Sequence, residues 1–150
     1  MAAMSGSAST EIDAPIEAVW AIVQDVESAP AWQRGIDSTK ALERDAAGRA
    51  IRCETVTDAK AKVFKARVSF AYEQPARLSW VQERGDLKSM AGSWHLEDLG
   101  GRRTRATYSL QADPGALLAR FLKGALEEKM RAILIEGRPA ELKARAEAAA

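Results

Sequence analysis

The stretch that decides the fold is residues 12–32, which read Ile-Asp-Ala-Pro-Ile-Glu-Ala-Val-Trp-Ala-Ile-Val-Gln-Asp-Val-Glu-Ser-Ala-Pro-Ala-Trp. Pro15 stands where a helix can begin, because its φ angle is already helical and the first turn needs no N–H from it. Apolar residues then recur on one helical face, at Val19, Trp20, Ile22 and Val23. The stretch predicts a first strand over 5–12, a helix over 15–24, and a short helix or turn over 27–32.

Six further strand-like segments follow, and each ends at turn residues such as Asp, Gly or Pro. They cover residues 36–44, 50–57, 61–73, 77–84, 88–99 and 103–112. After these strands the apolar residues recur at the spacing of a helix, which predicts a helix over 115–136. Gly137, Arg138 and Pro139 are expected to break or kink this helix, with residues 141–149 continuing as a solvated piece.

This order of elements indicates an α+β protein in which one face of an antiparallel sheet is buried against a C-terminal helix. A chain of 150 residues without internal repeats is expected to form one domain over 1–150. The oligomeric state is left open by the sequence.

Composition excludes several classes of protein. The net charge is +1, from 22 basic and 21 acidic residues, so we expect no DNA partner. Neither a secretory signal nor an apolar run of about 20 residues is present, so we expect no membrane span and a cytoplasmic location. The sequence holds no phosphate-binding glycine loop, His-Glu-x-x-His motif or nucleophile elbow. We therefore expect no metal site and no cofactor.

The aromatic residues of the strands share one parity. Phe64, Phe70, Trp80, Trp94 and Tyr108 all have even numbers, and residues two apart in a strand point to the same face. The faces of neighbouring strands agree only if the connections near 74–75, 85–86 and 100–101 hold an odd number of residues or a bulge. Most such aromatic stripes are ordinary core.

Several motifs together resemble a known family. They are the opening stretch 12–32, Leu78-Ser79-Trp80, Gly92-Ser93-Trp94-His95-Leu96, Gly101, the strand 104–108 and the final helix. The chain resembles the START-like (SRPBCC) helix-grip superfamily, in its polyketide cyclase and coenzyme Q-binding-protein branch. The resemblance implies a curved antiparallel sheet of about seven strands wrapped around a long C-terminal helix, with two short helices after the first strand. It also implies a cavity for a small apolar ligand.

The first functional hypothesis is therefore binding or transport of a small hydrophobic ligand, such as a lipid, a quinone or a polycyclic compound, between the sheet and the helix. Two polar residues, Arg84 and Thr104, are candidate groups at this pocket. The candidate ligand-binding residues are Phe64, Phe70, Trp80, Met90, Trp94, Tyr108, Leu118, Phe121 and Leu122.

Two alternatives stay open. A polyketide aromatase or cyclase needs polar groups in the pocket for acid–base work, and the predicted inward set is nearly all apolar. A ribosome- or protein-interacting member of the family would use a basic surface, for which Arg102, Arg103 and Arg105 are the hint. Whether the protein is an enzyme is left open, and no catalytic residue is assigned.

His95 is the only histidine and Cys53 the only cysteine, which leaves too few ligands for a zinc site built from these residue types. By parity His95 points away from Trp94, toward solvent. Cys53 is expected to be a small buried apolar residue rather than a nucleophile.

Overall fold

The computed structural model describes residues 4–59 and 62–149. Seven strands of this part of the chain form one antiparallel sheet, ordered β1-β7-β6-β5-β4-β3-β2. The strands are β1 (Met4–Ile12), β2 (Ile36–Arg44), β3 (Ala50–Asp58), β4 (Val63–Glu73), β5 (Arg77–Gly85), β6 (Ser89–Gly100) and β7 (Arg103–Asp113). The α+β helix-grip prediction is confirmed, although the predicted start of the fourth strand at residue 61 lies outside the described residues.

Two short helical elements follow the first strand, as predicted. They are α1 (Ile16–Val23) and the 3₁₀ helix η1 (Val26–Ala31). The Pro15 carbonyl accepts the first hydrogen bonds of α1, from the N–H groups of Ala18 at 3.0 Å and Val19 at 3.1 Å. The face that α1 buries carries Ile16, Val19, Trp20 and Val23.

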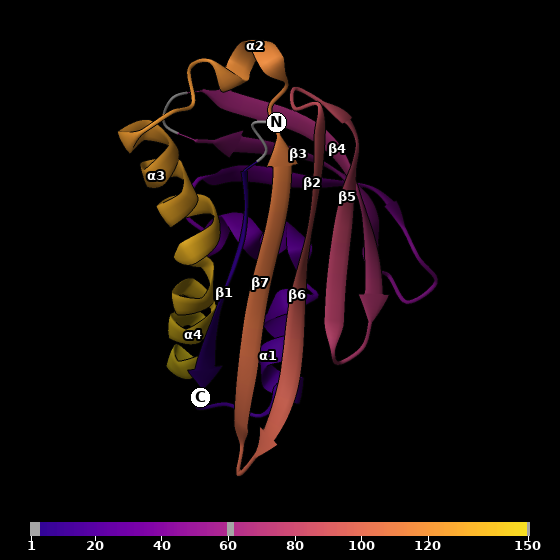
Figure 1. Ribbon diagram of the computed structural model, residues 1–150. Helices are drawn as coiled ribbons and strands as arrows, with labels where there is room; N and C mark the ends of the chain where they lie inside the picture. The colour runs from indigo at the N-terminus through magenta and orange to yellow at the C-terminus, as the bar shows by residue number, and fades with distance from the viewer. Residues whose placement is uncertain (1–3, 60–61, 150) are drawn as a thin grey trace.

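The C-terminal helix begins later than the sequence indicated. The predicted helix over 115–136 is divided into a four-residue helix, α2 (Ala116–Ala119), and a second helix, α3 (Ala125–Arg131). Gly124 separates them with a φ of 60°, a left-handed conformation that no helix interior accommodates. The segment from Gly115 to Gly124 therefore crosses one end of the molecule before the long helix starts (Figure 1).

The expected break at residues 137–139 is instead a π-helical turn, η2 (Ala132–Glu136), which leads into α4 (Arg138–Ala148). The N–H of Gly137 donates to the carbonyl of Ala132 at 2.9 Å. Pro139 lies in the first turn of α4, where its missing N–H costs nothing. As a result α3, η2 and α4 form one column beside β1 (Figure 1).

The expectation that residues 141–149 are a solvated piece is wrong. Helix α4 packs on β1 and α1, and its Leu142 and Ala146 are buried. The apolar positions of α4 are spaced four apart, so they form a single stripe that faces the sheet. One end of the molecule, which we call the packed end, is closed by this stripe, by α1, and by the halves of β1, β6 and β7 that are drawn lower in Figure 1. The other end, under α2 and η1, is called the hollow end.

The strand register confirms the predicted faces. Trp94 pairs with Leu78 in β5 and with Tyr108 in β7, so even positions lie opposite even positions. The connections 74–76 and 86–88 have three residues each, and a register shift lies between Asp98 and Gly100. Odd-length connections and bulges of this kind keep side chains on one face.

Candidate functional site: a cavity between the sheet and the C-terminal helix

A cavity of about 170 Å³ lies at the hollow end, between the inner face of the sheet and the elements η1, α3, η2 and α4. Its wall has three parts, contributed by the central strands, by the β2–β3 edge of the sheet and by the helices. Each part has its own chemistry.

The central strands supply an aromatic wall. The ring centroids of Phe70 and Trp80 lie 6.2 Å apart, those of Trp80 and Tyr108 5.6 Å, and those of Tyr108 and Trp94 4.7 Å. Trp32, which follows η1, extends the series with its centroid 6.2 Å from that of Trp94. These separations are typical of rings that pack edge to face or offset, so the wall is one continuous aromatic surface.

Gly92 fixes the position of one of these rings. A Cβ atom at this glycine would lie 2.5 Å from Cζ2 of Trp80, far inside van der Waals contact. Gly92 and Trp80 are also paired across β5 and β6. The glycine of the Gly-x-Trp motif is therefore needed because the indole of the neighbouring strand lies against its backbone.

The β2–β3 edge of the sheet is more polar. Thr39, Thr55 and Thr57 bring hydroxyl groups to the cavity wall. On β3 the residues that face the cavity have odd numbers, whereas those on β4 have even numbers. The reason is that four residues connect Asp58 to Val63, so Thr57 pairs with Phe64 and shares its face of the sheet.

The helical side is apolar except for Arg138. Leu122, Met130 and Leu134 line this side together with the Arg138 side chain. Arg138 is only 2% exposed, and its Nη1 donates to the carbonyl of Arg34 at 2.6 Å and to Oε1 of Glu141 at 3.0 Å. Glu141 in turn accepts a hydrogen bond from the N–H of Arg34 at 2.7 Å. Helix α4 thus binds both the N–H and the carbonyl group of Arg34, which lies in the connection between η1 and β2.

Tyr108 stands beside this arginine. Burial raises the pKa of the Tyr108 hydroxyl above its ordinary value, and the nearby positive charge of Arg138 acts in the opposite direction. At neutral pH the hydroxyl therefore keeps its proton and can donate a hydrogen bond, but it cannot act as a base.

Most of the predicted ligand-binding residues lie in the cavity wall. The sequence-predicted residues found there are Phe64, Phe70, Trp80, Met90, Trp94, Tyr108 and Leu122. They come from four strands and from the segment before α3, which the fold brings together. Their role in binding remains a prediction.

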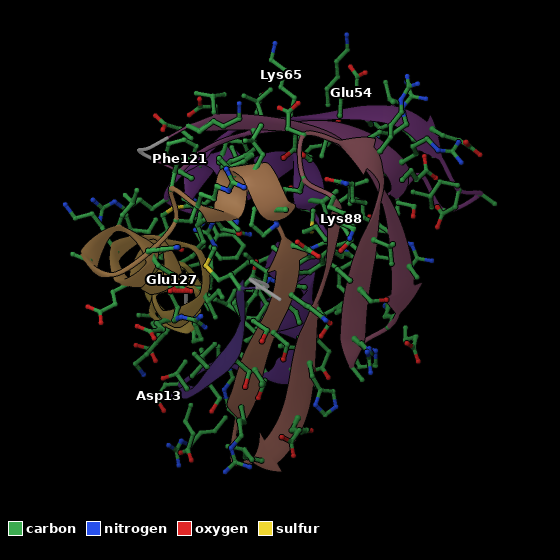
Figure 2. All side chains as sticks on the ribbon, turned by 45° about the horizontal axis from the view of Figure 1, so that its top comes forward. Asp13, Glu54, Lys65, Lys88, Phe121 and Glu127 are labelled. Carbon is green, nitrogen blue, oxygen red and sulfur yellow. The ribbon has the colours of Figure 1, made fainter. Side chains whose placement is uncertain are left out.

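The two other apolar candidates lie outside the wall. Leu118 packs against the core without lining the cavity. Phe121 is 68% exposed and lies on the outside of the α2–α3 connection (Figure 2). The interruption at Gly124 is the reason, because residues 115–124 do not follow the continuous helix on which the prediction of their facing depended.

Arg84 does not reach the cavity either. Val68 pairs with Gln82 whereas Arg67 pairs with Arg84, so Glu83 is an extra residue in β5. Such a bulge reverses the alternation of the strand. Gln82 therefore lies in the cavity wall, whereas Arg84 lies in a shallow groove on the outer face.

Thr104 faces inward, as its parity indicated, but it lies at the packed end. Its hydroxyl is fully buried and donates to the carbonyl of Ala14 at 2.8 Å. The hydrogen bond ties β7 to the connection between β1 and α1. Thr104 is therefore a structural residue and not a polar group of the cavity.

Sequence reasoning missed part of the wall. Leu110 and Ala112 continue the even parity of β7 and could have been included on that ground, and Met130 and Leu134 lie on the predicted helix. Arg138 had no such signal in the sequence, because a buried arginine is rare. Of its two partners, Arg34 is 104 positions away and Glu141 lies on the next turn of α4.

The two single residues lie as expected. His95 is exposed on the outer face of β6. Cys53 is fully buried, and burial raises the pKa of its thiol to about 11. At neutral pH the thiol is protonated and is a poor nucleophile.

Two arginines of the basic cluster, Arg103 and Arg105, are paired with carboxylates. Arg103 forms ion pairs with Glu11 and, at 3.3 Å, with Asp13. Arg105 forms ion pairs with Glu11 at 3.4 Å and Glu97 at 3.9 Å. The surface therefore carries alternating charges, which does not favour a nucleic acid as partner.

Within residues 4–59 and 62–149, no three His, Cys, Asp or Glu side chains are grouped so that they could hold a metal ion. No helix in the same residues is both long and apolar enough to cross a membrane.

The fold is shared with several solved structures. A START superfamily protein from Mycobacterium smegmatis superimposes with a TM-score of 0.82 at 19% identity, covering 97% of this chain and 99% of that one. A protein from Thermus thermophilus gives 0.82 at 21% identity, covering 98% and 99%. The aromatase/cyclase ZhuI from Streptomyces sp. R1128 gives 0.76 at 16% identity, covering 97% and 94%. These similarities show that the chain has the same fold as these proteins, the helix-grip fold of the START-like class.

The family follows from the sequence itself. Residues 12–136 match the family model described as polyketide cyclase / dehydrase and lipid transport. The chain belongs to this family, which confirms the resemblance drawn from the motifs. Among curated proteins, none matches the chain.

Proposed function

We propose that this protein binds a small, largely apolar molecule with flat rings in the cavity at the hollow end. The observation that carries the proposal is the continuous aromatic wall from Phe70 to Trp32 beside about 170 Å³ of unfilled space. Interiors are normally packed to the density of crystals, so aromatic rings that border a void leave contacts unmade. A ring compound that fills the void restores those contacts and removes apolar surface from water, at about 25 cal/mol per Å².

The cavity volume limits the size of the ligand. An engineered apolar cavity of about 150 Å³ in another protein holds benzene, so 170 Å³ accommodates one or two rings. A longer isoprenoid or polycyclic ligand requires the segment over the hollow end to move. This segment runs between Gly115 and Gly124, both of which have positive φ angles.

The test is a titration of tryptophan fluorescence with naphthalene. Trp32, Trp80 and Trp94 line the cavity, so binding is expected to change their emission with a saturable curve. Ala112→Phe fills the space from β7 and is expected to abolish the change, whereas Ala71→Phe adds the same ring on the exposed outer face of β4. Equal responses from wild type and both folded variants would show that the cavity is not the binding site.

An aromatase or cyclase is the second candidate, because Tyr108 and Arg138 place a hydroxyl and a guanidinium group in the wall. In this role Tyr108 would donate a hydrogen bond to a ketone oxygen of the substrate. Solvent water would take the proton of an acidic methylene group, the resulting enolate carbon would attack the ketone carbon, and the protonated oxygen would then leave as water together with a second methylene proton. Incubation with a poly-β-ketone thioester, followed by mass spectrometry, measures that loss of water. Acceleration by wild type but not by Tyr108→Phe would support catalysis, and an unchanged compound would support binding alone.

A further inference from the structure

Two buried hydrogen-bond donors in the cavity wall have no acceptor in the described part of the chain. They are Nε of Arg138 and Nε1 of Trp32. A buried N–H without a partner destabilises a protein, so such groups are uncommon unless something else satisfies them.

The two donors belong to one region of the wall. Trp32 packs on Trp94, Trp94 packs on Tyr108, and Tyr108 interacts with Arg138. Arg138 also binds the carbonyl of Arg34, two residues after Trp32. A ligand that rests on Trp94 and Tyr108 therefore lies next to both donor residues, Trp32 and Arg138, which line the same cavity.

The charge of Arg138 is already balanced. Its guanidinium group forms an ion pair with Glu141 at 3.0 Å, and the Arg138 side chain is almost completely buried. An anionic ligand group would add an uncompensated negative charge to a region of low dielectric, which is strongly unfavourable. A neutral oxygen would accept a hydrogen bond without that penalty.

We infer that the ligand carries an uncharged oxygen acceptor, such as a ketone or quinone carbonyl, at the end that rests on Trp94 and Tyr108. The inference rests on the proposed function and specifies its ligand chemistry: a flat apolar body with a neutral carbonyl, and not a carboxylate. The buried donors supply the polar contact that orients such a molecule in an otherwise apolar pocket.

Other unpaired polar atoms do not belong to this region. Nε1 of Trp20 is buried on α1, at the packed end. Oε1 of Gln82 is an acceptor, and the same amide donates through Nε2 to the carbonyl of Leu87 at 2.9 Å, which places it near the β5–β6 connection. Nε of Arg67 belongs to β4, at the groove on the outer face that also holds Arg84. None of these three atoms provides a donor beside Trp94.

The experiment compares three compounds with the same two-ring skeleton: tetralin, 1-tetralone and tetralin-1-carboxylate. Calorimetric titration of the wild-type protein is expected to give 1-tetralone an affinity about three- to tenfold above that of tetralin, as one net hydrogen bond provides. The carboxylate is expected to bind most weakly. Infrared spectroscopy of bound 1-tetralone is expected to show a lowered carbonyl frequency, which reports the hydrogen bond directly.

Three variants separate the contributions. Trp32→Phe keeps the aromatic packing but removes the N–H, and Arg138→Lys keeps the charge but removes the guanidinium group. Both are expected to reduce the preference for 1-tetralone over tetralin. Glu141→Gln removes the balancing charge and is expected to raise the affinity for the carboxylate while leaving that for tetralin unchanged.

The outcomes distinguish this inference from the proposed function. Equal affinities for tetralin and 1-tetralone, with an unshifted carbonyl frequency, would overturn the inference and leave the cavity as an apolar binding site. Tightest binding of the carboxylate would also overturn it, and loss of that binding in Lys65→Gln would assign the anion to the exposed lysine in the wall. If none of the three compounds binds, the proposed function fails as well.

Discussion

The two ends of the sheet share the same strands but differ in what covers them. At the packed end, Leu96 of β6 pairs with Ala106 of β7, and both are fully or almost fully buried beneath α1 and α4. Farther along the same strands, Met90 pairs with Ala112, and both border the cavity. The alternation of apolar residues is the same at both ends. A hydrophobic pattern therefore identifies the inner face of a sheet but not whether that face meets protein or an unfilled space.

The largest expected effect tests this difference with one substitution made at each end. Leu142→Ala at the packed end removes a fully buried side chain and is expected to lower the free energy of unfolding by about 3 kcal/mol. Leu134→Ala in the cavity wall is expected to lower it by about half as much, because fewer contacts exist to lose. Urea denaturation of both variants measures the two values. Equal losses would contradict the division into a packed and a hollow end.

A smaller effect is expected from the buried hydroxyl of Thr104. Thr104→Val keeps the shape but leaves the carbonyl of Ala14 without its donor, so a loss of about 1–3 kcal/mol is expected. Thermal unfolding measures the loss, and the naphthalene titration serves as control. An altered affinity with unchanged stability would mean that Thr104 does act at the cavity.

A similar or smaller loss of stability is expected for Gly92→Ala, at about 1–2 kcal/mol, because the new methyl group displaces the indole of Trp80. The displacement has a readout of its own. Near-ultraviolet circular dichroism and tryptophan emission are expected to change, and naphthalene binding is expected to weaken. Ser93→Ala, at the adjacent position on the other face of β6, is the control. Unchanged spectra in Gly92→Ala would contradict the close approach of Trp80.

The smallest effect is expected at Phe121. Because its ring is largely exposed, Phe121→Ala is expected to change the free energy of unfolding by less than about 0.5 kcal/mol. Chemical denaturation checks this value. A loss comparable to that of Leu142→Ala would mean that the ring is buried in solution and that residues 115–124 pack differently.

Local pattern was sufficient for most of the fold. All seven strands and the inward positions of Trp80, Trp94 and Tyr108 follow from alternation and turn residues, because these signals act between near neighbours. Arg84 was misplaced because the bulge at Glu83 has no clear mark in the residues around it. The break at Gly124 did have a mark, since glycine weakens a helix, but the helical spacing of the apolar residues was given more weight.

Arg138 marks the limit of such reasoning. Its burial depends on the carbonyl of Arg34, 104 positions away, and on a carboxylate in α4. A sequence shows that an arginine is present but not which distant groups balance its charge. The polar part of the cavity wall could therefore be found only once the chain was folded.

The position of β1 in the sheet has a consequence for how the chain folds. Each of the strands β2 to β6 is adjacent to the strand that follows it in the chain, whereas β1 pairs only with β7 within the described sheet. Residues 4–12 therefore have no strand partner until residues 104–112 have been synthesised, and this long loop closes slowly. Pulse-labelling hydrogen exchange during refolding is expected to show protection of β6 and β7 amides before those of β1. On the ribosome, the N-terminal strand waits for nearly the whole domain to emerge.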